Sequence, residues 1–266
     1  MTDIFEFIIQ GYRNGYYQKL LLNTHGGDFY SKATEYLFTV IIAQELLKWR
    51  KAQTQNYSFS IHFEHSAVEF KKSCFEAVRL VKPGEIWDGR IIRRDTHTSI
   101  RNESGRIDIA VLYHPRQGLL REARAFAGIE VKGINPRNTK VKQDILRLID
   151  CLCAEDSIGD NSLKSCYVVY GVRLDSSVKI FENEDFLKGK LRMENDVENL
   201  LTSIPEVRKV NYSNRFFEIS KTTAEEFRKY NIDEDGLTDY QEVVAGSGAI
   251  LGVLIHFTVK AKENNL

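Results

Sequence analysis

The chain has 266 residues, with 37 basic and 37 acidic side chains, 42% hydrophobic residues and 28% charged residues. This balance is typical of a globular protein and excludes a disordered chain or a collagen-like repeat. The zero net charge excludes a basic surface that covers the whole protein, so nucleic-acid binding would require local clusters of lysine and arginine. We expect one elaborated domain, with a core at about 31–180 and a C-terminal elaboration at about 181–266.

We expect neither a membrane span nor an export signal. The longest uncharged apolar stretch, from about Ser247 to Val259, is shorter than the ~20 residues of a membrane-spanning helix. The first residues include Asp3 and Glu6 and lack the basic start of a signal peptide. The cysteines form no CxxC pair, as is typical of thiols in a reducing compartment, so we expect a cytoplasmic protein.

Hydrophobic spacing predicts a helix and two strands in the first half of the chain. Residues 35–50 have the pattern of a largely buried helix that starts between 31 and 34. Residues 87–92 and 106–113 have the composition of strands, and the segment between them has the composition of a turn. These segments predict strands around a loop or hairpin.

The middle of the chain predicts a βαβ unit. Residues 126–132 predict a strand, and 140–153 have helical spacing. Residues 166–172 are continuously apolar, as in a strand that is buried on both faces of a sheet. We expect the crossover that joins the two strands to be right-handed.

Beyond residue 180 the chain becomes more charged. Its spacing predicts a helix at 182–201, a strand at 215–219, a helix at 222–230 and a closing strand at 250–259. The closing strand can return to the main sheet, so we do not divide the chain into two domains.

Two of the predicted strands carry charged side chains among aliphatic ones. In residues 106–112 the two-residue period places Ile107 and Ile109 on one face and Asp108 on the other. In residues 126–132 it places Glu130 and Lys132 on one face. Burying these charges is costly unless they pair or hold a metal, and carboxylates suit Mg²⁺ bound beside a phosphate. A lysine there can orient the attacking water, help to deprotonate it, or stabilise charge on the phosphate.

The predicted order is a helix, the strand with Asp108, the strand with Glu130 and Lys132, a helix and a further strand. This pattern resembles the PD-(D/E)XK nuclease superfamily. The resemblance covers about 31–172, although the proline of the family name is absent. It implies an α/β, restriction-endonuclease-like fold, in which helices flank a mixed central β-sheet, with a C-terminal helical and strand elaboration. It also implies that Asp108, Glu130 and the Val131 carbonyl bind Mg²⁺ or Mn²⁺, and that Lys132 is the catalytic lysine.

Many members of this superfamily also carry a glutamate on the first helix. Glu35 matches that position best as a catalytic residue, and Glu45 is the alternative. An acidic residue in a first helical turn is also favoured by the helix dipole, whatever its function. Both interpretations of Glu35 stay open.

Two basic groups flank the acidic residues and could contact phosphates. One lies in the helix after the Glu130 strand and in the loop before it, because that helix often faces the site in similar nucleases. Its members are Arg137, Lys140, Lys142 and Gln143, together with Arg147. The other precedes the Asp108 strand and includes Arg93 and Arg94. A solvated surface is the alternative for both groups.

The acidic stretch 231–242 has the spacing of an EF-hand-like Ca²⁺ loop. Its candidate ligands are Asn231, Asp233, Asp235, Asp239 and Glu242. The alternative interpretation is an acidic turn with an Asp-Gly bend.

Together these patterns predict a metal-dependent nuclease, acting on DNA in preference to RNA and as an endonuclease in preference to an exonuclease. Its size, without helicase or polymerase motifs, is similar to that of restriction or phage-defence effectors. A homodimer is compatible with this activity, since cutting both strands of a duplex commonly takes two sites. The alternative function is a catalytically inactive nucleic-acid-binding or assembly protein on the same fold, stabilised by Ca²⁺.

Overall fold

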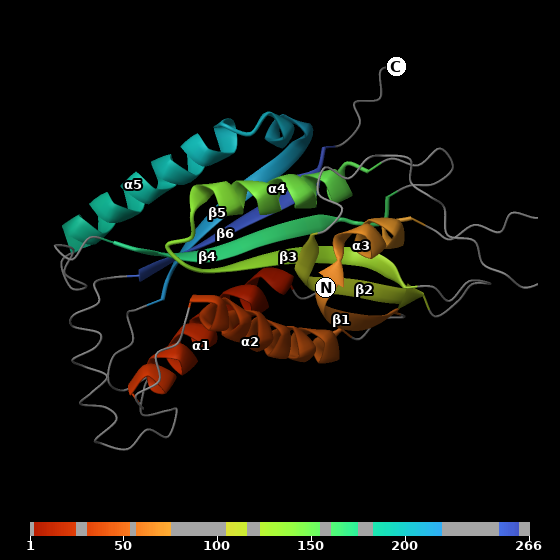
Figure 1. Ribbon diagram of the computed structural model, residues 1–266, viewed down its shortest axis with the longest axis horizontal. Coiled ribbons are helices and arrows are strands. Elements are labelled where there is room, and N and C mark those ends of the chain that lie inside the picture. The colour runs from red at the N-terminus through yellow and green to blue at the C-terminus, as the bar shows by residue number, and fades with distance from the viewer. Residues whose placement is uncertain are drawn as a thin grey trace, which may run out of the picture.

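The computed structural model describes residues 3–24, 31–53, 57–75, 105–115, 123–154, 161–174, 183–219 and 250–260. In this part of the chain, helices cover both faces of a mixed sheet, so the predicted α/β class is confirmed (Figure 1). The helices are α1 (Ile4–Thr24), α2 (Ser31–Ala52), α3 (Ala67–Ser73), α4 (Asn138–Leu152) and α5 (Asn183–Thr202), with a short 3-10 helix at Pro205–Lys209.

The described strands form one six-stranded sheet in the order β1-β2-β3-β4-β6-β5. They are β1 (Tyr57–Ser66), β2 (Arg106–Pro115), β3 (Arg124–Ile134), β4 (Ser165–Arg173), β5 (Val210–Glu218) and β6 (Ile250–Val259). All neighbours are antiparallel except β3 and β4, which are parallel and joined through α4. The predicted βαβ unit is therefore confirmed, and the closing strand does return to the main sheet.

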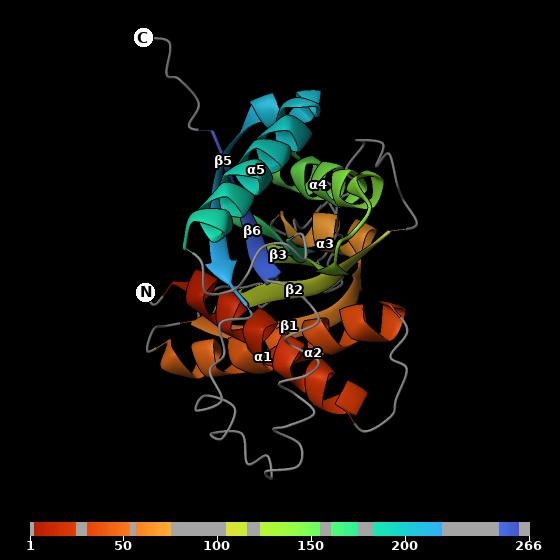
Figure 2. The ribbon, with the colours of Figure 1, turned by 90° about the vertical axis from the view of Figure 1, so that its left-hand side faces the viewer.

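Two helix layers enclose this sheet, with a hydrophobic core on each face. Helices α1 and α2 cover one face, and α3, α4 and α5 cover the other, as the turned view in Figure 2 shows. Helices α1 and α2 pack closely because two glycines face α2. A Cβ atom at Gly11 would collide with Ile42, and one at Gly15 with Phe38.

Most predicted elements have a counterpart close to their predicted bounds, and β6 has the bounds predicted for it. Helices α1 and α3 and strand β1 were not predicted as elements. Strand β5 begins at Val210 rather than at residue 215. The strand predicted at 87–92 and the helix at 222–230 lie outside the described residues. No helix in the described ranges is long and apolar enough to cross a membrane.

Candidate active site

The predicted site lies where β2 and β3 stop pairing. Their antiparallel ladder ends with Ile109 opposite Ile129. Beyond this point, Asp108 Oδ2 accepts a hydrogen bond from the backbone N–H of Val131 at 2.8 Å, so a side chain supplies the partner of this N–H. Pairing of β3 with β4 also becomes irregular between Val131 and Ile134. The last residues of β3 are thus not regularly paired with either neighbouring strand, β2 or β4.

Side-chain alternation along β2 changes at the same place. Ile109 and Val111 pack into the core beneath α1 and α2, whereas Ile107 packs into the core beneath α3 and α4. The prediction that Ile107 shares a face with Ile109 is therefore wrong. The change falls where the ladder with β3 has ended and where the other neighbour, β1, has Glu64 at a φ of 48° between Phe63 and His65. The regular two-residue alternation is therefore interrupted at Asp108.

Three carboxylates predicted for the site surround the Lys132 ammonium. Its Nζ atom lies 2.7 Å from Glu35 Oε1, 3.4 Å from Asp108 Oδ2 and 4.0 Å from Glu130 Oε2. These side chains come from α2, β2 and β3, so the structure brings together all four residues predicted as catalytic. The alternative residue, Glu45, instead pairs with neighbours on α1 and α2.

Two further charged residues join this cluster from α4. Asp144 Oδ2 lies 3.1 Å from Lys132 Nζ. The guanidinium of Arg147 lies 2.6 Å from Glu130 Oε1 and 3.1 Å from Asp144 Oδ1, and it donates a hydrogen bond to the Arg106 carbonyl at 2.9 Å. Arg147 thus holds Glu130 and joins it to Asp144.

Sequence reasoning missed Asp144 and considered Arg147 only as a phosphate contact. The signal that could have found them is their position on α4. They lie three residues apart, among the buried apolar residues Ile145 and Leu148. A charge on the buried face of an amphipathic helix needs a partner, so it points to a charged cluster.

The cluster carries an excess of negative charge. When all its groups are ionised, it holds four carboxylates and two cations, a net charge of minus two. The carboxylates are Glu35, Asp108, Glu130 and Asp144, and the cations are Lys132 and Arg147. Glu130 is 1% exposed and Lys132 is 8% exposed, so water screens these charges little.

Burial and mutual repulsion shift the pKa values of these groups. Burial raises the pKa of Glu130 well above its usual range, and Asp108 and Asp144 add to this effect, against the pull of the two cations. Burial alone would lower the pKa of Lys132, but the surrounding carboxylates outweigh it and raise that pKa. Lys132 is therefore protonated at neutral pH.

The donor set of this cluster fits a hard divalent cation. Among the described residues, no three metal-binding side chains are already grouped as a metal site, and the Lys132 ammonium lies between the carboxylates. Asp144 is 5% exposed, and its Oδ2 atom has the Lys132 ammonium 3.1 Å away as its ion-pair partner. The Val131 carbonyl accepts a hydrogen bond from Lys132 Nζ at 3.1 Å. Mg²⁺ and Mn²⁺ prefer oxygen ligands, and either ion would offset the excess negative charge of this cluster.

Apart from Arg147, the predicted phosphate contacts that the structure describes lie outside the ion pairs of the cluster. Arg137, Lys140 and Gln143 are exposed at the start of α4. Lys142 faces α5, and its Nζ atom donates a hydrogen bond to the Ser203 carbonyl at 3.2 Å. Other predicted residues fall outside the described ranges, namely Arg93, Arg94 and the predicted Ca²⁺ ligands Asn231, Asp233, Asp235, Asp239 and Glu242.

No family model matches this chain, and neither does any curated protein or solved structure. The chemistry of the site is therefore inferred from its own geometry.

Proposed function

We propose that this protein is a nuclease that hydrolyses phosphodiester bonds with the help of Mg²⁺ or Mn²⁺. The observation that carries the proposal is the convergence of Glu35, Asp108, Glu130 and Lys132 on one buried cluster. A buried cluster with unbalanced charge opposes folding, which is typical of residues that serve a function. The proposed substrate is DNA in preference to RNA.

The order of elements also supports this proposal. Along the chain, helix α2 and strand β1 are followed by the short helix α3, the antiparallel strands β2 and β3, helix α4 and strand β4, which is parallel to β3. A helix, the Asp108 strand, the Glu130 strand, a helix and a further strand are what the resemblance to PD-(D/E)XK nucleases implies. Roles in restriction or phage defence, a homodimer and a cytoplasmic location stay predictions.

In this proposal, Asp108, Glu130 and the Val131 carbonyl would hold the metal. A bound divalent ion supplies Lewis-acid activation of water and of the phosphate. Lys132 is protonated, so its task would be to stabilise the negative charge that develops on the phosphate. Glu35 accepts a short hydrogen bond from the ammonium and would orient it.

The remaining charged residues would act through these groups. Arg147 contacts Glu130 and the Arg106 carbonyl, so it would fix the Glu130 carboxylate relative to β2. Asp144 contacts both cations of the cluster, so it would fix the position of the Lys132 ammonium relative to the Arg147 guanidinium. Both are positioning residues in this scheme.

Cleavage of plasmid, linear duplex and single-stranded DNA, and of RNA, tests the proposal. We expect turnover with Mg²⁺ or Mn²⁺ and none with EDTA. Lys132→Ala and Asp108→Asn should each lower the rate by about a hundredfold or more. The matched control is Lys51→Ala, at an exposed position near the end of α2, which should keep the full rate.

Cleavage that survives in Lys132→Ala would contradict the proposal. So would the absence of cleavage by the natural protein with either metal on all four substrates. The second result would favour the alternative function, an inactive nucleic-acid-binding or assembly protein.

A further inference from the structure

The Lys132 ammonium is surrounded by more oxygen atoms than it can donate to. An ammonium has three N–H donors. Five oxygens lie within 4.0 Å of its Nζ atom, namely Glu35 Oε1 at 2.7 Å, the Val131 carbonyl at 3.1 Å, Asp144 Oδ2 at 3.1 Å, Asp108 Oδ2 at 3.4 Å and Glu130 Oε2 at 4.0 Å. The ammonium is therefore shared among these oxygens and is not committed to one ion pair.

These oxygens fall into two groups. Asp108, Glu130 and the Val131 carbonyl are the groups proposed to hold the divalent ion. Glu35 and Asp144 come from the flanking helices α2 and α4 and are not among the predicted metal ligands. Because Lys132 Nζ contacts both groups, its ammonium already uses oxygens that the ion would need.

The ammonium and a divalent ion cannot share these oxygens without a cost. Mg²⁺ lies about 2.1 Å from each oxygen that it binds, and the Lys132 ammonium is itself 3.1 Å from the Val131 carbonyl. The Lys132 side chain is 10% exposed, so water screens the repulsion between the two positive charges only weakly. The ion can therefore bind well only if the ammonium moves away.

The structure offers the ammonium a second set of partners. Glu35 is its closest neighbour, at 2.7 Å, and Asp144 lies at 3.1 Å. An ammonium that leaves Asp108 and the Val131 carbonyl can stay paired with these two carboxylates. The displacement therefore leaves no buried charge without a partner, which would otherwise be costly.

We infer that Lys132 controls the metal affinity of its own site. Its ammonium competes with the divalent ion for Asp108 and the Val131 carbonyl, and it withdraws toward Glu35 and Asp144 when the ion binds. The inference rests on the proposed function, since it takes Asp108 and Val131 as metal ligands. The apparent metal affinity is lowered by the fraction of molecules in which the ammonium occupies these oxygens. Lys132 thus opposes metal binding although turnover needs it.

Titration of the full chain with Mn²⁺, without nucleic acid, tests this inference. Calorimetry measures the affinity, and electron paramagnetic resonance of free Mn²⁺ checks it independently of activity. Lys132→Met removes the ammonium and keeps an unbranched apolar side chain. We expect this variant to bind Mn²⁺ about tenfold more tightly or more than the natural protein, while its cleavage activity is lost.

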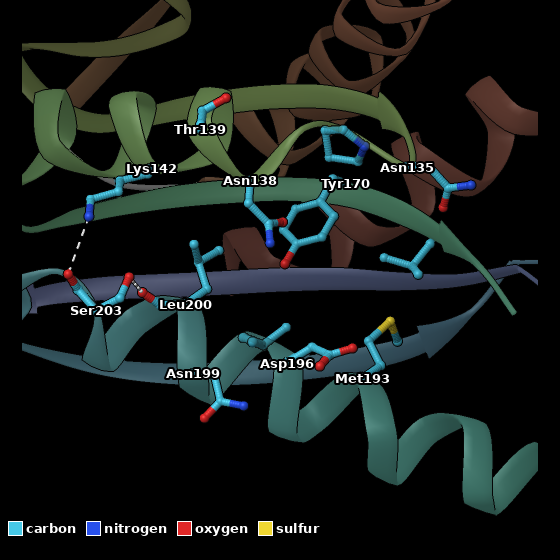
Figure 3. Close-up of a pocket in the computed structure, with 13 residues that line it drawn as sticks. Asn135, Asn138, Thr139, Lys142, Tyr170, Met193, Asp196, Asn199, Leu200 and Ser203 are labelled. Carbon is cyan, nitrogen blue, oxygen red and sulfur yellow. Dashed lines mark hydrogen bonds between the residues drawn. The ribbon is translucent and has the colours of Figure 1, made fainter.

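Lys142→Met is the matched control, because it removes the same charge from the neighbouring helix α4. Figure 3 shows the Lys142 side chain directed toward Ser203, whose carbonyl accepts a hydrogen bond from Nζ at 3.2 Å. This variant should bind Mn²⁺ with the natural affinity. Equal tightening in both lysine variants would be an effect of net charge and would overturn the inference.

Glu35→Gln tests the inference in a protein that keeps the ammonium. It removes the closest partner of the ammonium, so Mn²⁺ binding should weaken about tenfold. Glu45→Gln, on the same helix and paired with Lys48, should leave the affinity unchanged. In the Lys132→Met background, Glu35→Gln should have no further effect. Weakening that persists in that background would make Glu35 a metal ligand and would overturn the inference.

The outcomes separate this inference from the proposed function. Equal or weaker Mn²⁺ binding by folded Lys132→Met would overturn the inference alone. No Mn²⁺ binding by the natural protein or by any variant at millimolar concentration would overturn the proposed metal site as well. Circular dichroism establishes that each variant is folded. If Lys132→Met is not folded, Glu35→Gln and Glu45→Gln decide, and equal affinities in these two variants would overturn the inference.

Discussion

The hydroxyl of Tyr12 on α1 lies 2.9 Å from the Lys132 carbonyl oxygen and 3.1 Å from the Gly133 carbonyl oxygen. These carbonyls belong to the part of β3 that leaves its regular pairing with β4. Tyr12 is completely buried, and its ring stacks on Phe38 with the centroids 4.5 Å apart. Helix α1 therefore fixes the backbone that carries the candidate catalytic lysine.

Tyr12→Phe should lower both stability and turnover. Removal of the hydroxyl leaves buried carbonyls without this donor, at a cost of about 1 to 3 kcal/mol in the free energy of unfolding. The Lys132 backbone would lose the hydrogen bond that fixes its position, so we expect kcat to fall while KM changes little. Urea unfolding and cleavage kinetics measure the two effects.

Tyr17→Phe is the matched control on the same helix. The Tyr17 hydroxyl donates a buried hydrogen bond to the Ile219 carbonyl at 2.9 Å, away from the charged cluster. This variant should lose similar stability and keep its kcat. If both variants lowered kcat equally, the effect of Tyr12 would be one of general stability.

Asp108→Asn should stabilise the metal-free protein. It removes one negative charge from the excess of carboxylates and keeps an oxygen that can accept from the Val131 N–H. We expect a higher Tm in EDTA and the loss of any rise in Tm on adding Mg²⁺, as is typical when a residue is kept for function at the expense of stability. A lower Tm in EDTA would show that Asp108 is a structural ion-pair partner.

Arg147→Met should destabilise the protein by about 3 kcal/mol, because it leaves a buried carboxylate without its charged partner. The carboxylate is that of Glu130, 2.6 Å from the guanidinium. The double variant Arg147→Met with Glu130→Gln removes both charges, so it should recover much of the stability while staying inactive. Denaturant unfolding of the two variants checks this. No recovery in the double variant would mean that Arg147 stabilises through other contacts.

The pH dependence of metal-free stability should carry a contribution from Glu130. Its pKa is higher in the folded than in the unfolded protein, because of burial and the nearby carboxylates Asp108 and Asp144. The folded state therefore binds a proton more tightly, so this contribution is fully present below the unfolded pKa and is lost as pH rises through the folded pKa. Compared with Glu130→Gln, the natural protein should gain stability on acidification from neutral pH. Chemical unfolding in EDTA at several pH values measures the difference, and parallel curves would contradict it.

The sequence predicted those features that depend on local periodicity. Strands β3, β4 and β6 and helix α4 have strong hydrophobic patterns, and the structure has each of them near its predicted bounds. The proximity of Glu35 to Lys132 required the family resemblance, because no local pattern connects a residue of α2 with one of β3.

Features that depend on tertiary contacts were not predictable in this way. The change of face at Ile107 coincides with the end of the β2–β3 ladder and with the left-handed backbone of Glu64 in β1, neither of which the sequence marks. Asp144 was missed, and Arg147 was predicted only as a phosphate contact, because charges on a helix are ordinarily solvated. Their burial depends on the partners that β3 supplies.

The place of β6 in the sheet affects how the protein is made. This strand lies between β4 and β5, yet residues 250–259 are the last part of the chain that the structure describes. While the chain is being synthesised, β4 has no partner on that side until β6 has left the ribosome, and β4 is almost entirely apolar. An open apolar strand edge invites pairing with other chains. We therefore expect the nascent chain to be most prone to self-association before β6 has been made.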